Sequence, residues 1–411
     1  MSTAALDVLI VGGGFAGSCA AALLQRASHA DGRPLAVAVL ERARLAAPPA
    51  AAPLEARVTT LSRASERILQ HAGAWERIAG PRIGPCERMR IWHQSASASG
   101  SGVLIFDAAE AGEPDLGHIA ENRLVQTAVV DAFEAAGGRL ILGELQGLRA
   151  CETHIEARTT AGPLEARLVV GADGARSAVR EAIGLTVESA SYRETAIVAN
   201  VSTERPHERT AYQRFLGAGT LAFLPLADGS SSIVWSADTP VAETLLSGSD
   251  ADFEWELQRQ SDDVLGATRL LTERTSFPLG RMAAHRYTAR RCALIGDAAH
   301  VVHPLAGQGA NLALLDAAAL AEVVIDAARE GEDPGAERVL RRYERWRKSE
   351  TLLMAGAIEA FDRYLAHGSG PLARVAQRGL GWVNRSQELK RMFIARALGL
   401  SGELPEPARL R

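Results

Sequence analysis

The stretch that decides the fold is Leu294-Ile295-Gly296-Asp297-Ala298-Ala299-His300-Val301-Val302-His303-Pro304-Leu305-Ala306-Gly307-Gln308-Gly309-Ala310-Asn311. The apolar run at residues 292–295 predicts a buried strand, and this strand ends at a Gly-Asp pair. At such a strand end the carboxylate of Asp297 leaves the sheet and can accept hydrogen bonds from the hydroxyl groups of a ligand.

The loop after this strand leads into a helix. Pro304 fixes one backbone angle of the loop, and Gly307 and Gly309 let the backbone come close to a flat group. Residues 311–328 are rich in Ala and Leu and predict a helix. Because the helix begins where the loop ends, its free N–H groups and positive dipole end would face the ligand.

The N-terminal region has the element order of a dinucleotide-binding unit. Its centre is a glycine-rich loop, Gly12-Gly13-Gly14-Phe15-Ala16-Gly17, which would connect a strand to a helix. The expected elements are a strand at residues 8–11, a helix at 18–26, and a second strand at 35–40 that ends at Glu41.

Each residue type in this unit suits one task. Gly12 would make the tight turn, Gly14 would admit a pyrophosphate, and Gly17 would allow close packing of the helix. Glu41 would hold ribose hydroxyls, and the polar insert at residues 28–34 explains why it lies farther along than the usual ~20 residues. Three neighbouring side chains complete the candidate contacts: Phe15, Ala16 and Arg42.

Together these motifs resemble the class A FAD-dependent aromatic monooxygenases, and most closely the subgroup that hydroxylates the ring of ubiquinone precursors. The resemblance implies that Asp297 binds the ribityl chain of FAD and that Pro304 lies beside the isoalloxazine ring. It also implies that the backbone of Gly307, Gln308, Gly309, Ala310 and Asn311 lies at the pyrimidine edge. A helix N-terminus in that position would stabilise negative charge on a reduced flavin.

Three further segments fit the same family. The segment Arg57-Val58-Thr59-Thr60-Leu61-Ser62 resembles one in which the arginine lies by the flavin, although Glu55 stands where the subgroup has Asp. The resemblance favours a role for Arg123, at the start of an expected helix, on the cofactor phosphates or ribityl chain. Asp173 ends a strand at residues 164–171 and is followed by Gly174, as in the family's Asp-Gly motif, which implies contact with ribityl hydroxyls.

Residues 192–277 differ in character, because short strand candidates follow one another at regular spacing. The segments Phe223-Leu224-Pro225-Leu226 and Ile233-Val234-Trp235-Ser236 resemble the ubiquinone subgroup in particular. We expect a mainly antiparallel sheet with one face over the flavin. Its apolar side chains would line the substrate pocket or pack in the core.

The expected fold is α/β: a Rossmann-like FAD-binding domain of the p-hydroxybenzoate hydroxylase type, a mainly antiparallel β-sheet substrate domain, and C-terminal helices. The FAD-binding domain would be discontinuous and would comprise residues 1–75, 119–190 and 275–336. The substrate domain would comprise residues 76–118 and 191–274, and residues 337–411 would form the helical region.

The resemblance implies an enzyme that uses non-covalently bound FAD, NADH or NADPH, and dioxygen. Oxygen would add at the flavin C4a position and pass to the ring of a phenolic, polyprenylated ubiquinone precursor. The alternatives are the hydroxylation of another aromatic or secondary metabolite and an FAD-bound non-catalytic subunit of a biosynthetic complex. His300 and His303 lie near the flavin motif but fit structural hydrogen bonding better, so the sequence identifies no catalytic residue.

The composition excludes several other classes. The net charge of −4 gives no reason to expect nucleic acid as a partner. The four cysteines are widely separated, which indicates neither a zinc site nor a disulfide framework and favours a reducing, cytoplasmic location. No run of about 18 uncharged apolar residues predicts a membrane span, and the N-terminus does not resemble a signal peptide.

The tail at residues 371–400 combines apolar and basic side chains. Its six basic residues stand against Glu388 alone, and its apolar residues, which include Trp382 and Phe393, recur at roughly helical spacing. This pattern suits peripheral contact with the inner face of a membrane or with a biosynthetic complex. Packing of the tail on its own domain is the alternative.

Overall fold

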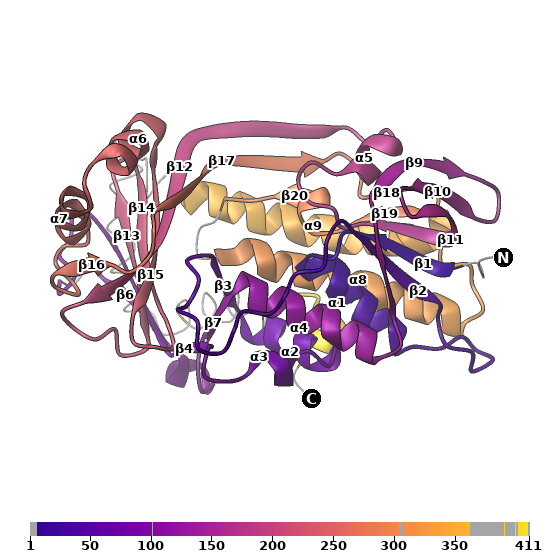
Figure 1. Ribbon diagram of the computed structural model, residues 1–411, viewed down its shortest axis with the longest axis horizontal. Helices are drawn as coiled ribbons and strands as arrows, with labels where there is room; N and C mark the ends of the chain where they lie inside the picture. Colours follow the sequence, from indigo (N-terminus) through magenta and orange to yellow (C-terminus); the bar gives the residue numbers. More distant parts are fainter. Residues whose placement is uncertain are drawn as a thin grey trace.

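The structure is a computed structural model that describes residues 6–100, 102–303, 307–361, 390, 399 and 402–409. The described chain is elongated, with a parallel sheet and most helices at one end and a second, larger sheet at the other (Figure 1). Two long strands, β12 (Val187–Thr203) and β17 (Thr275–Ala284), run from one end to the other (Figure 1).

The parallel sheet is built on β1 (Leu6–Val11), all six residues of which are buried, as expected for a central strand. β1 lies between β2 (Val37–Glu41) and β11 (Gly162–Gly171) and is parallel to both. β8 (Arg139–Leu142) extends the sheet beside β2, and β19 (Cys292–Leu294) extends it beside β11. The chain continues from β1 to β2 and β8 on one side of it and later adds β11 and β19 on the other side. In open α/β sheets, ligands bind at the point where the strand order reverses in this way.

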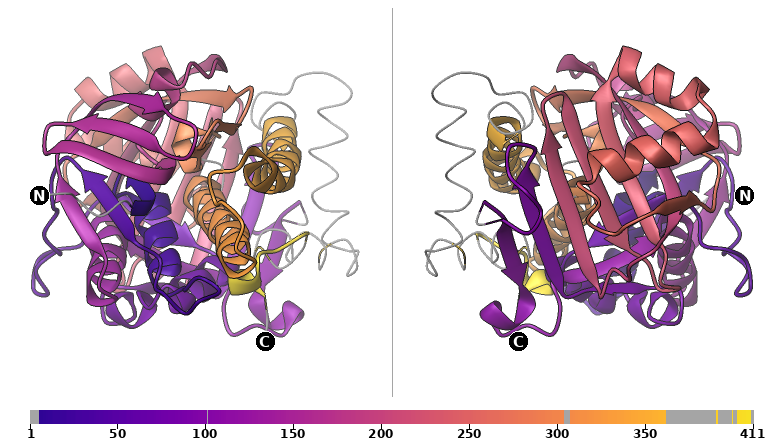
Figure 2. Two further views of the ribbon diagram at one scale, coloured as in Figure 1. Left: turned by 90° about the vertical axis from the view of Figure 1, so that its right-hand side faces the viewer. Right: turned by 90° about the vertical axis from the view of Figure 1, so that its left-hand side faces the viewer.

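Helices cover this sheet. α1 (Phe15–Gln25) packs against both α4 (Asn122–Ala135) and α8 (Gln308–Arg329), which lie below the sheet in Figure 1. α9 (Glu337–Phe361) packs beside α8 (Figure 2). Smaller elements complete this end of the molecule: α2 (Arg63–His71), α3 (Trp75–Ile78), β9 (Leu145–Ala150), β10 (Ile155–Thr159), α5 (Ala178–Ala182), β18 (Thr288–Ala289), η2 (Gly296–Ala298) and η5 (Glu406–Ala408).

The second sheet has nine strands in the order β20-β17-β12-β15-β14-β13-β5-β6, with β16 paired to β12. Its neighbours are antiparallel except for β13 and β5, which are parallel. α6 (Thr239–Ser247) and α7 (Asp250–Gln260) cover its outer face (Figure 2). The other strands are β5 (Arg88–His93), β6 (Leu104–Asp107), β13 (Thr210–Leu216), β14 (Gly219–Pro225), β15 (Ser231–Asp238), β16 (Thr268–Leu270) and β20 (His300–Val301).

A three-stranded sheet joins the two ends of the molecule. It consists of β3 (Val58–Leu61), β7 (Gly117–Glu121) and β4 (Gly84–Cys86), and η1 (Ala108–Ala111) precedes β7. β3 packs on α8, and β4 packs on β14, so this sheet contacts both larger parts. Among the described residues, no helix combines the length and apolar character needed to cross a membrane.

Candidate functional site

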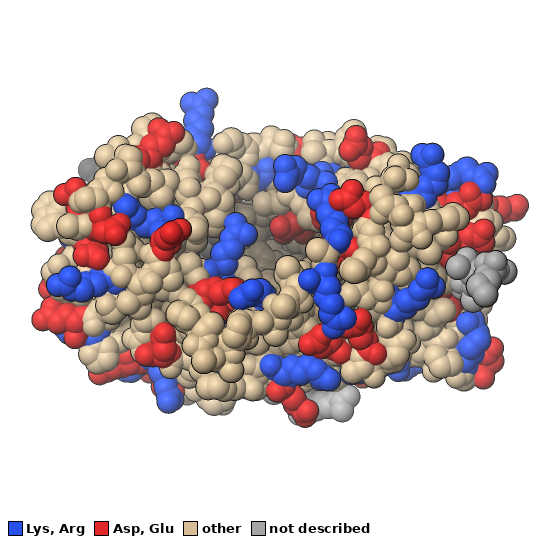
Figure 3. Space-filling model, viewed as in Figure 1, with Lys and Arg blue, Asp and Glu red and all other residues tan. Residues whose placement is uncertain are grey.

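A cavity of about 650 Å³ lies between the parallel sheet and the nine-stranded sheet. This volume is within the range of small-molecule and cofactor sites. The cavity opens as a hollow near the centre of the molecular face in Figure 3, with Lys and Arg side chains around it. Both ends of the molecule contribute to its wall, since Gly14 and Asp297 line it together with Val198 and Leu224.

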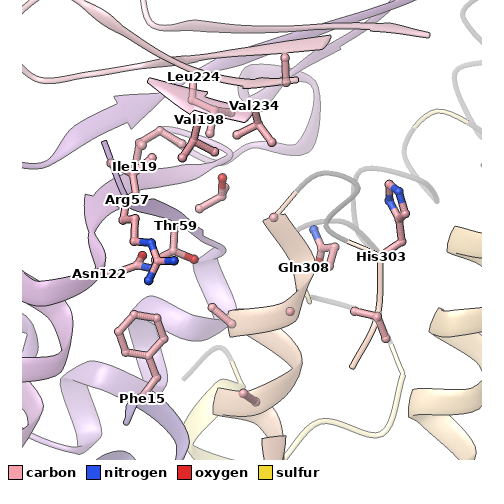
Figure 4. Close-up of a pocket in the computed structure, with 18 of the residues that line it drawn as sticks. Phe15, Arg57, Thr59, Ile119, Asn122, Val198, Leu224, Val234, His303 and Gln308 are labelled. Carbon is pink, nitrogen blue, oxygen red and sulfur yellow. The ribbon is translucent and has the colours of Figure 1, made fainter. Parts of the chain in front are cut away.

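The nine-stranded sheet supplies an apolar wall through the alternation of its strands. In β14, Leu224 faces the cavity, whereas Phe223 is 2% exposed and packs into the core beneath α6 and α7. In β15, Val234 likewise faces the cavity and Trp235 faces the core. Leu224, Val234 and Val198 stand together on one side of the site in Figure 4. Each of the two segments that resemble the ubiquinone subgroup, residues 223–226 and 233–236, therefore contributes side chains both to the cavity and to the core.

The glycine loop between β1 and α1 has the geometry that a nucleotide requires. Gly12 has a φ of +105°, and a Cβ there would lie 2.4 Å from the carbonyl oxygen of Ala172. A Cβ on Gly17 would lie 1.9 Å from the carbonyl oxygen of Gly12, so α1 packs directly on the turn. A Cβ on Gly14 would have no described atom within 4 Å. Protein atoms therefore pack against the loop at Gly12 and Gly17, whereas the space beside Gly14 is free for a ligand in the cavity.

The N-terminus of α8 forms the wall opposite the glycine loop. Gly307 begins the helix in the left-handed conformation, with a φ of +64°, and residues Gly307 to Ala310 line the cavity. The N–H groups of a first helical turn have no partner within the helix, so they favour an anionic or electron-rich group in the cavity.

Asp297 also faces the cavity, one residue into η2. Asp297 is an exposed residue that lines the cavity, yet the protein around it displaces enough water to raise the pKa of its carboxyl group, although His300 opposes the shift. Hydroxyl groups of a ligand that donate hydrogen bonds to Asp297 would favour the ionised form.

A fully buried ion-pair network supports this turn. The carboxylate of Asp316 on α8 accepts hydrogen bonds from Arg347 Nε at 2.8 Å and from the backbone N–H of Gly296 at 3.1 Å, and it contacts His300 Nε2 at 2.5 Å. Burial raises the pKa of Asp316, but His300 and Arg347 outweigh that effect and hold it below the ordinary value. Asp316 thus fixes the backbone beside Asp297.

The comparison with known families decides which ligand this geometry serves. The FAD binding domain family matches residues 5–352. The chain belongs to this family. The glycine loop, the open side of Gly14 and the helix N-terminus of α8 fit a dinucleotide with a flat, electron-rich ring. FAD is accordingly the cofactor of this protein.

Curated relatives cover almost the whole chain. The ubiquinone hydroxylase UbiL of Rhodospirillum rubrum is 36% identical over 407 residues, which are 98% of this chain and 92% of that protein. The 3-demethoxyubiquinol 3-hydroxylase of Escherichia coli is 32% identical over 97% of this chain and 100% of its own length. This FAD-binding protein is an FAD-dependent monooxygenase of the hydroxylase kind.

A solved structure with the same fold is the p-nitrophenol 4-monooxygenase PnpA of Pseudomonas putida. The TM-score is 0.76 at 20% identity, and the match covers 97% of this chain and 99% of that one. Klebsiella pneumoniae HpxO, complexed with FAD and uric acid, matches with a TM-score of 0.73 at 16% identity over 95% and 96% of the two chains. The α/β fold expected from the sequence is thereby confirmed.

The predicted cofactor residues of this monooxygenase fall into three groups. Those that line the cavity are Gly14, Phe15, Ala16, Arg57, Asp297, Gly307, Gln308, Gly309 and Ala310. Those that do not line the cavity are Gly12, Gly17, Glu41, Arg42, Arg123, Asp173 and Asn311. Pro304 lies outside the described residues, as do residues 371–400 apart from Lys390 and Gly399.

Several residues of the second group bind protein atoms. Glu41 accepts a hydrogen bond from the backbone N–H of Gly13. The carboxylate of Asp173 accepts from Ser177 Oγ at 2.5 Å and from the N–H of Val179 at 3.1 Å, so it caps the turn before α5. Arg123 forms an ion pair with Glu55, the residue that replaces the subgroup's Asp.

Asn311 joins three elements. Its Oδ1 accepts hydrogen bonds from the N–H of Ser62 at 2.9 Å and from Ser65 Oγ at 2.7 Å, and its Nδ2 donates to the carbonyl oxygen of Thr60 at 3.0 Å. Asn311 is 3% exposed. It therefore fixes the start of α8 against β3 and α2. Thr59 of β3 and Arg57, just before β3, lie at the cavity (Figure 4).

Sequence reasoning did not find the residues that support the site from a distance. Asp316 and Arg347 lie in expected helices, and neither belongs to a motif. One signal was present: Asp316 is an acid within an otherwise apolar stretch of α8, where a buried charge requires a partner. Glu194 was also missed, because it lies just before the strand candidate that begins at Thr195 and belongs to no motif.

Proposed function

We propose that this protein uses NAD(P)H and dioxygen to hydroxylate the aromatic ring of an apolar, polyprenylated phenol, a ubiquinone precursor. The main evidence for an apolar substrate is the apolar wall of the cavity, which Val198, Leu224 and Val234 of the nine-stranded sheet form (Figure 4). It is supported by relatives whose names specify ubiquinone hydroxylation.

The chain's own residues would hold the cofactor and protect the reaction. Gly14, Phe15 and Ala16 would admit the pyrophosphate, Asp297 would accept hydrogen bonds from the ribityl hydroxyls, and the N–H groups at the start of α8 would stabilise negative charge on the ring. The bound flavin supplies the oxidation–reduction chemistry with dioxygen. The apolar sheet wall would orient the phenol and exclude water.

The domain boundaries belong to the same proposal. Residues 1–75, 119–190 and 275–336 would act as the FAD-binding domain, residues 76–118 and 191–274 as the substrate domain, and residues 337–411 as the helical region. β12 and β17 pair with each other across the boundary between the first two. This pairing would hold the substrate sheet over the flavin.

The test is NAD(P)H oxidation by the FAD-loaded protein with a short-chain prenylated phenol and with 4-hydroxybenzoate. We expect rapid oxidation with the prenylated phenol and a product heavier by one oxygen atom in mass spectrometry. Tightly coupled hydroxylation of 4-hydroxybenzoate would replace our substrate class with small phenols. No phenol-dependent oxidation with either compound would favour a non-catalytic FAD-bound subunit.

A further inference from the structure

The strongest unexplained feature of the cavity is His303. It lies just after β20, is 1% exposed and lines the cavity near Gln308 (Figure 4). Neither of its ring nitrogens has a hydrogen-bond partner among the described residues. A buried imidazole normally satisfies at least one nitrogen, so an unpartnered one beside a ligand cavity indicates a partner that arrives with the ligand.

Glu194 of β12 faces this histidine. Its Oε2 lies 3.5 Å from His303 Nε2, and its side chain is 3% exposed. The edge of the Tyr192 ring packs on the imidazole, with ring centres 5.0 Å apart. The three side chains thus connect β12 to the loop that leads into α8.

An irregularity in β12 places Glu194 there. The pairing of β12 with β17 shifts register between Ser191 and Thr195, and Arg193 within the shift has a φ of +59°. A non-glycine residue in this conformation is strained, and such strain often occurs at functional sites. The bulge turns Glu194 inward, where a carboxylate is costly to bury without a cationic or hydrogen-bonding partner.

The neighbouring histidine provides a contrast. Nε2 of His300 contacts the carboxylate of Asp316, within the buried network that supports Asp297. His303 takes no part in that network, and nothing in the binding of FAD proposed above requires it. Its position fits the substrate half of the cavity, because Glu194 and Tyr192 belong to the strand that also carries Val198.

We propose that His303 is the catalytic base for the substrate's phenolic hydroxyl and that Glu194 is its positioning residue. With substrate bound, the 3.5 Å contact between Nε2 of His303 and Glu194 would tighten into a hydrogen bond donated by Nε2–H, which leaves the lone pair of Nδ1 to take the phenolic proton. A base oriented by a carboxylate in this way is a recurrent arrangement, and its hydrogen bonds are often long before the substrate binds. This inference rests on the function proposed above.

The protons and electrons of the step balance. The phenol gives its O–H proton to Nδ1, and the electron-rich phenolate ring then forms a bond to one oxygen atom derived from dioxygen. The O–O bond breaks in the same step, and its electron pair stays with the second oxygen atom. The ring hydrogen at that carbon leaves as a proton, and the phenolic oxygen regains a proton, so that His303 returns to its neutral form. NAD(P)H supplies the two electrons, and the second oxygen atom leaves as water.

The decisive experiment compares phenols of different acidity on His303→Asn and on the wild type, both loaded with FAD. With a short-chain prenylated phenol, we expect hydroxylation by the variant to fall on the order of 100-fold, as for the loss of a general base. Reducing equivalents would then pass to hydrogen peroxide. With a nitro-substituted prenylated phenol that is already ionised at neutral pH, we expect the variant to approach the wild-type rate.

A second measurement does not depend on turnover. A nitro-substituted prenylated phenol of intermediate acidity changes absorbance when it ionises, so its ionisation can be followed as it binds to the oxidised holoenzyme. The wild type should bind it as the phenolate, and His303→Asn should bind it as the neutral phenol. Glu194→Gln should show a smaller shift in the same direction, and Glu194→Asp should restore part of the wild-type behaviour.

The matched control is His93→Asn, which changes a buried histidine of the same sheet that does not line the cavity. It should resemble the wild type with both phenols. Equal losses with weakly and strongly acidic phenols in His303→Asn would overturn the assignment and make His303 structural. If the wild type itself hydroxylates no phenol, the proposed function fails instead, and the two failures are thus distinct.

Discussion

Asp297 shows how a single carboxyl group can link cofactor binding to pH. Its pKa is raised by burial in the FAD-free protein, so it carries a proton at pH values where an ordinary aspartate, with a pKa of about 3.9, has lost it. In the proposed role of Asp297, FAD hydroxyls would bind the ionised form, so FAD affinity should weaken as pH falls through this raised pKa. We expect Asp297→Asn to flatten that dependence in fluorescence titrations with FAD.

Asp297→Ala should weaken FAD binding at neutral pH by about 1–3 kcal/mol, because the ribityl hydroxyls lose their acceptor. This corresponds to roughly a 5- to 150-fold higher dissociation constant. Unchanged affinity in Asp297→Ala, together with an unchanged pH profile in Asp297→Asn, would show that Asp297 does not contact the cofactor.

Two glycines of one loop should respond differently to alanine. A Cβ on Gly17 would meet the carbonyl oxygen of Gly12 at 1.9 Å, so Gly17→Ala should destabilise the protein by about 1–3 kcal/mol or more even without FAD. Gly14→Ala meets no described atom, so it should fold normally and lose FAD affinity instead. Thermal unfolding of the FAD-free proteins and FAD titration separate the two effects, and equal stability losses would contradict this reading.

At the scale of elements, α9 stabilises the flavin turn through one buried arginine. Arg347 is 2% exposed and pairs with Asp316, which is fully buried. Arg347→Met should cost about 3–5 kcal/mol, because it removes one partner of a buried ion pair and leaves the carboxylate of Asp316 without its arginine. The control on the same helix is Arg341→Met, whose exposed pair with Glu337 should contribute about 0.5 kcal/mol. Urea unfolding measures both, and similar losses would refute a supporting role for Arg347.

The ion pairs of Asp316 also make the free energy of unfolding depend on pH in acid. The pKa of Asp316 is lowered in the folded protein, so its contribution is present above the pKa of an unfolded aspartate, about 3.9, and is lost as pH falls through the lower folded value. In Arg347→Met, that folded pKa rises. The stability difference between wild type and variant should therefore shrink as the solution is acidified below about pH 4.

The sequence predicted local elements better than distant contacts. The C-terminal helical region was expected to begin at residue 337, where α9 begins, and β1, α1 and β2 were expected to within a few residues. Apolar periodicity and glycine motifs carry that information within one element. The Asp316–Arg347 pair joins two helices, and the position of Glu194 depends on a bulge in β12, so neither can be read from local periodicity.

The alternation of strands explains the partial success with the substrate wall. The segments that resemble the ubiquinone subgroup were correctly placed in one sheet, but resemblance alone does not say which face each residue occupies. Leu224 and Val234 face the cavity, while Phe223 and Trp235 pack against the outer helices. Register decides the face, and it depends on pairing with β13 and β12, which the sequence does not specify.

At the scale of the whole molecule, the apolar substrate proposed above would have to reach the cavity from a membrane. We predict that the tail at residues 371–400 contacts an anionic membrane surface. Lys390 pairs with Glu110 at 2.7 Å, so the other five basic residues of the tail carry the prediction: Arg374, Arg378, Arg385, Arg391 and Arg396. Each basic residue near such a surface contributes on the order of 1 kcal/mol, and salt screens that attraction.

Flotation with anionic vesicles tests this prediction on the full chain. The wild type should float at low salt and less at high salt. Replacement of Arg374, Arg378 and Arg385 by Glu should abolish flotation while FAD binding persists, because these residues lie outside the cofactor motifs. Replacement of Arg149, Arg205 and Arg209 by Glu makes the same charge change on exposed arginines elsewhere and should leave flotation intact. If both triple variants float as well as the wild type, the substrate reaches the cavity without a membrane contact through this tail.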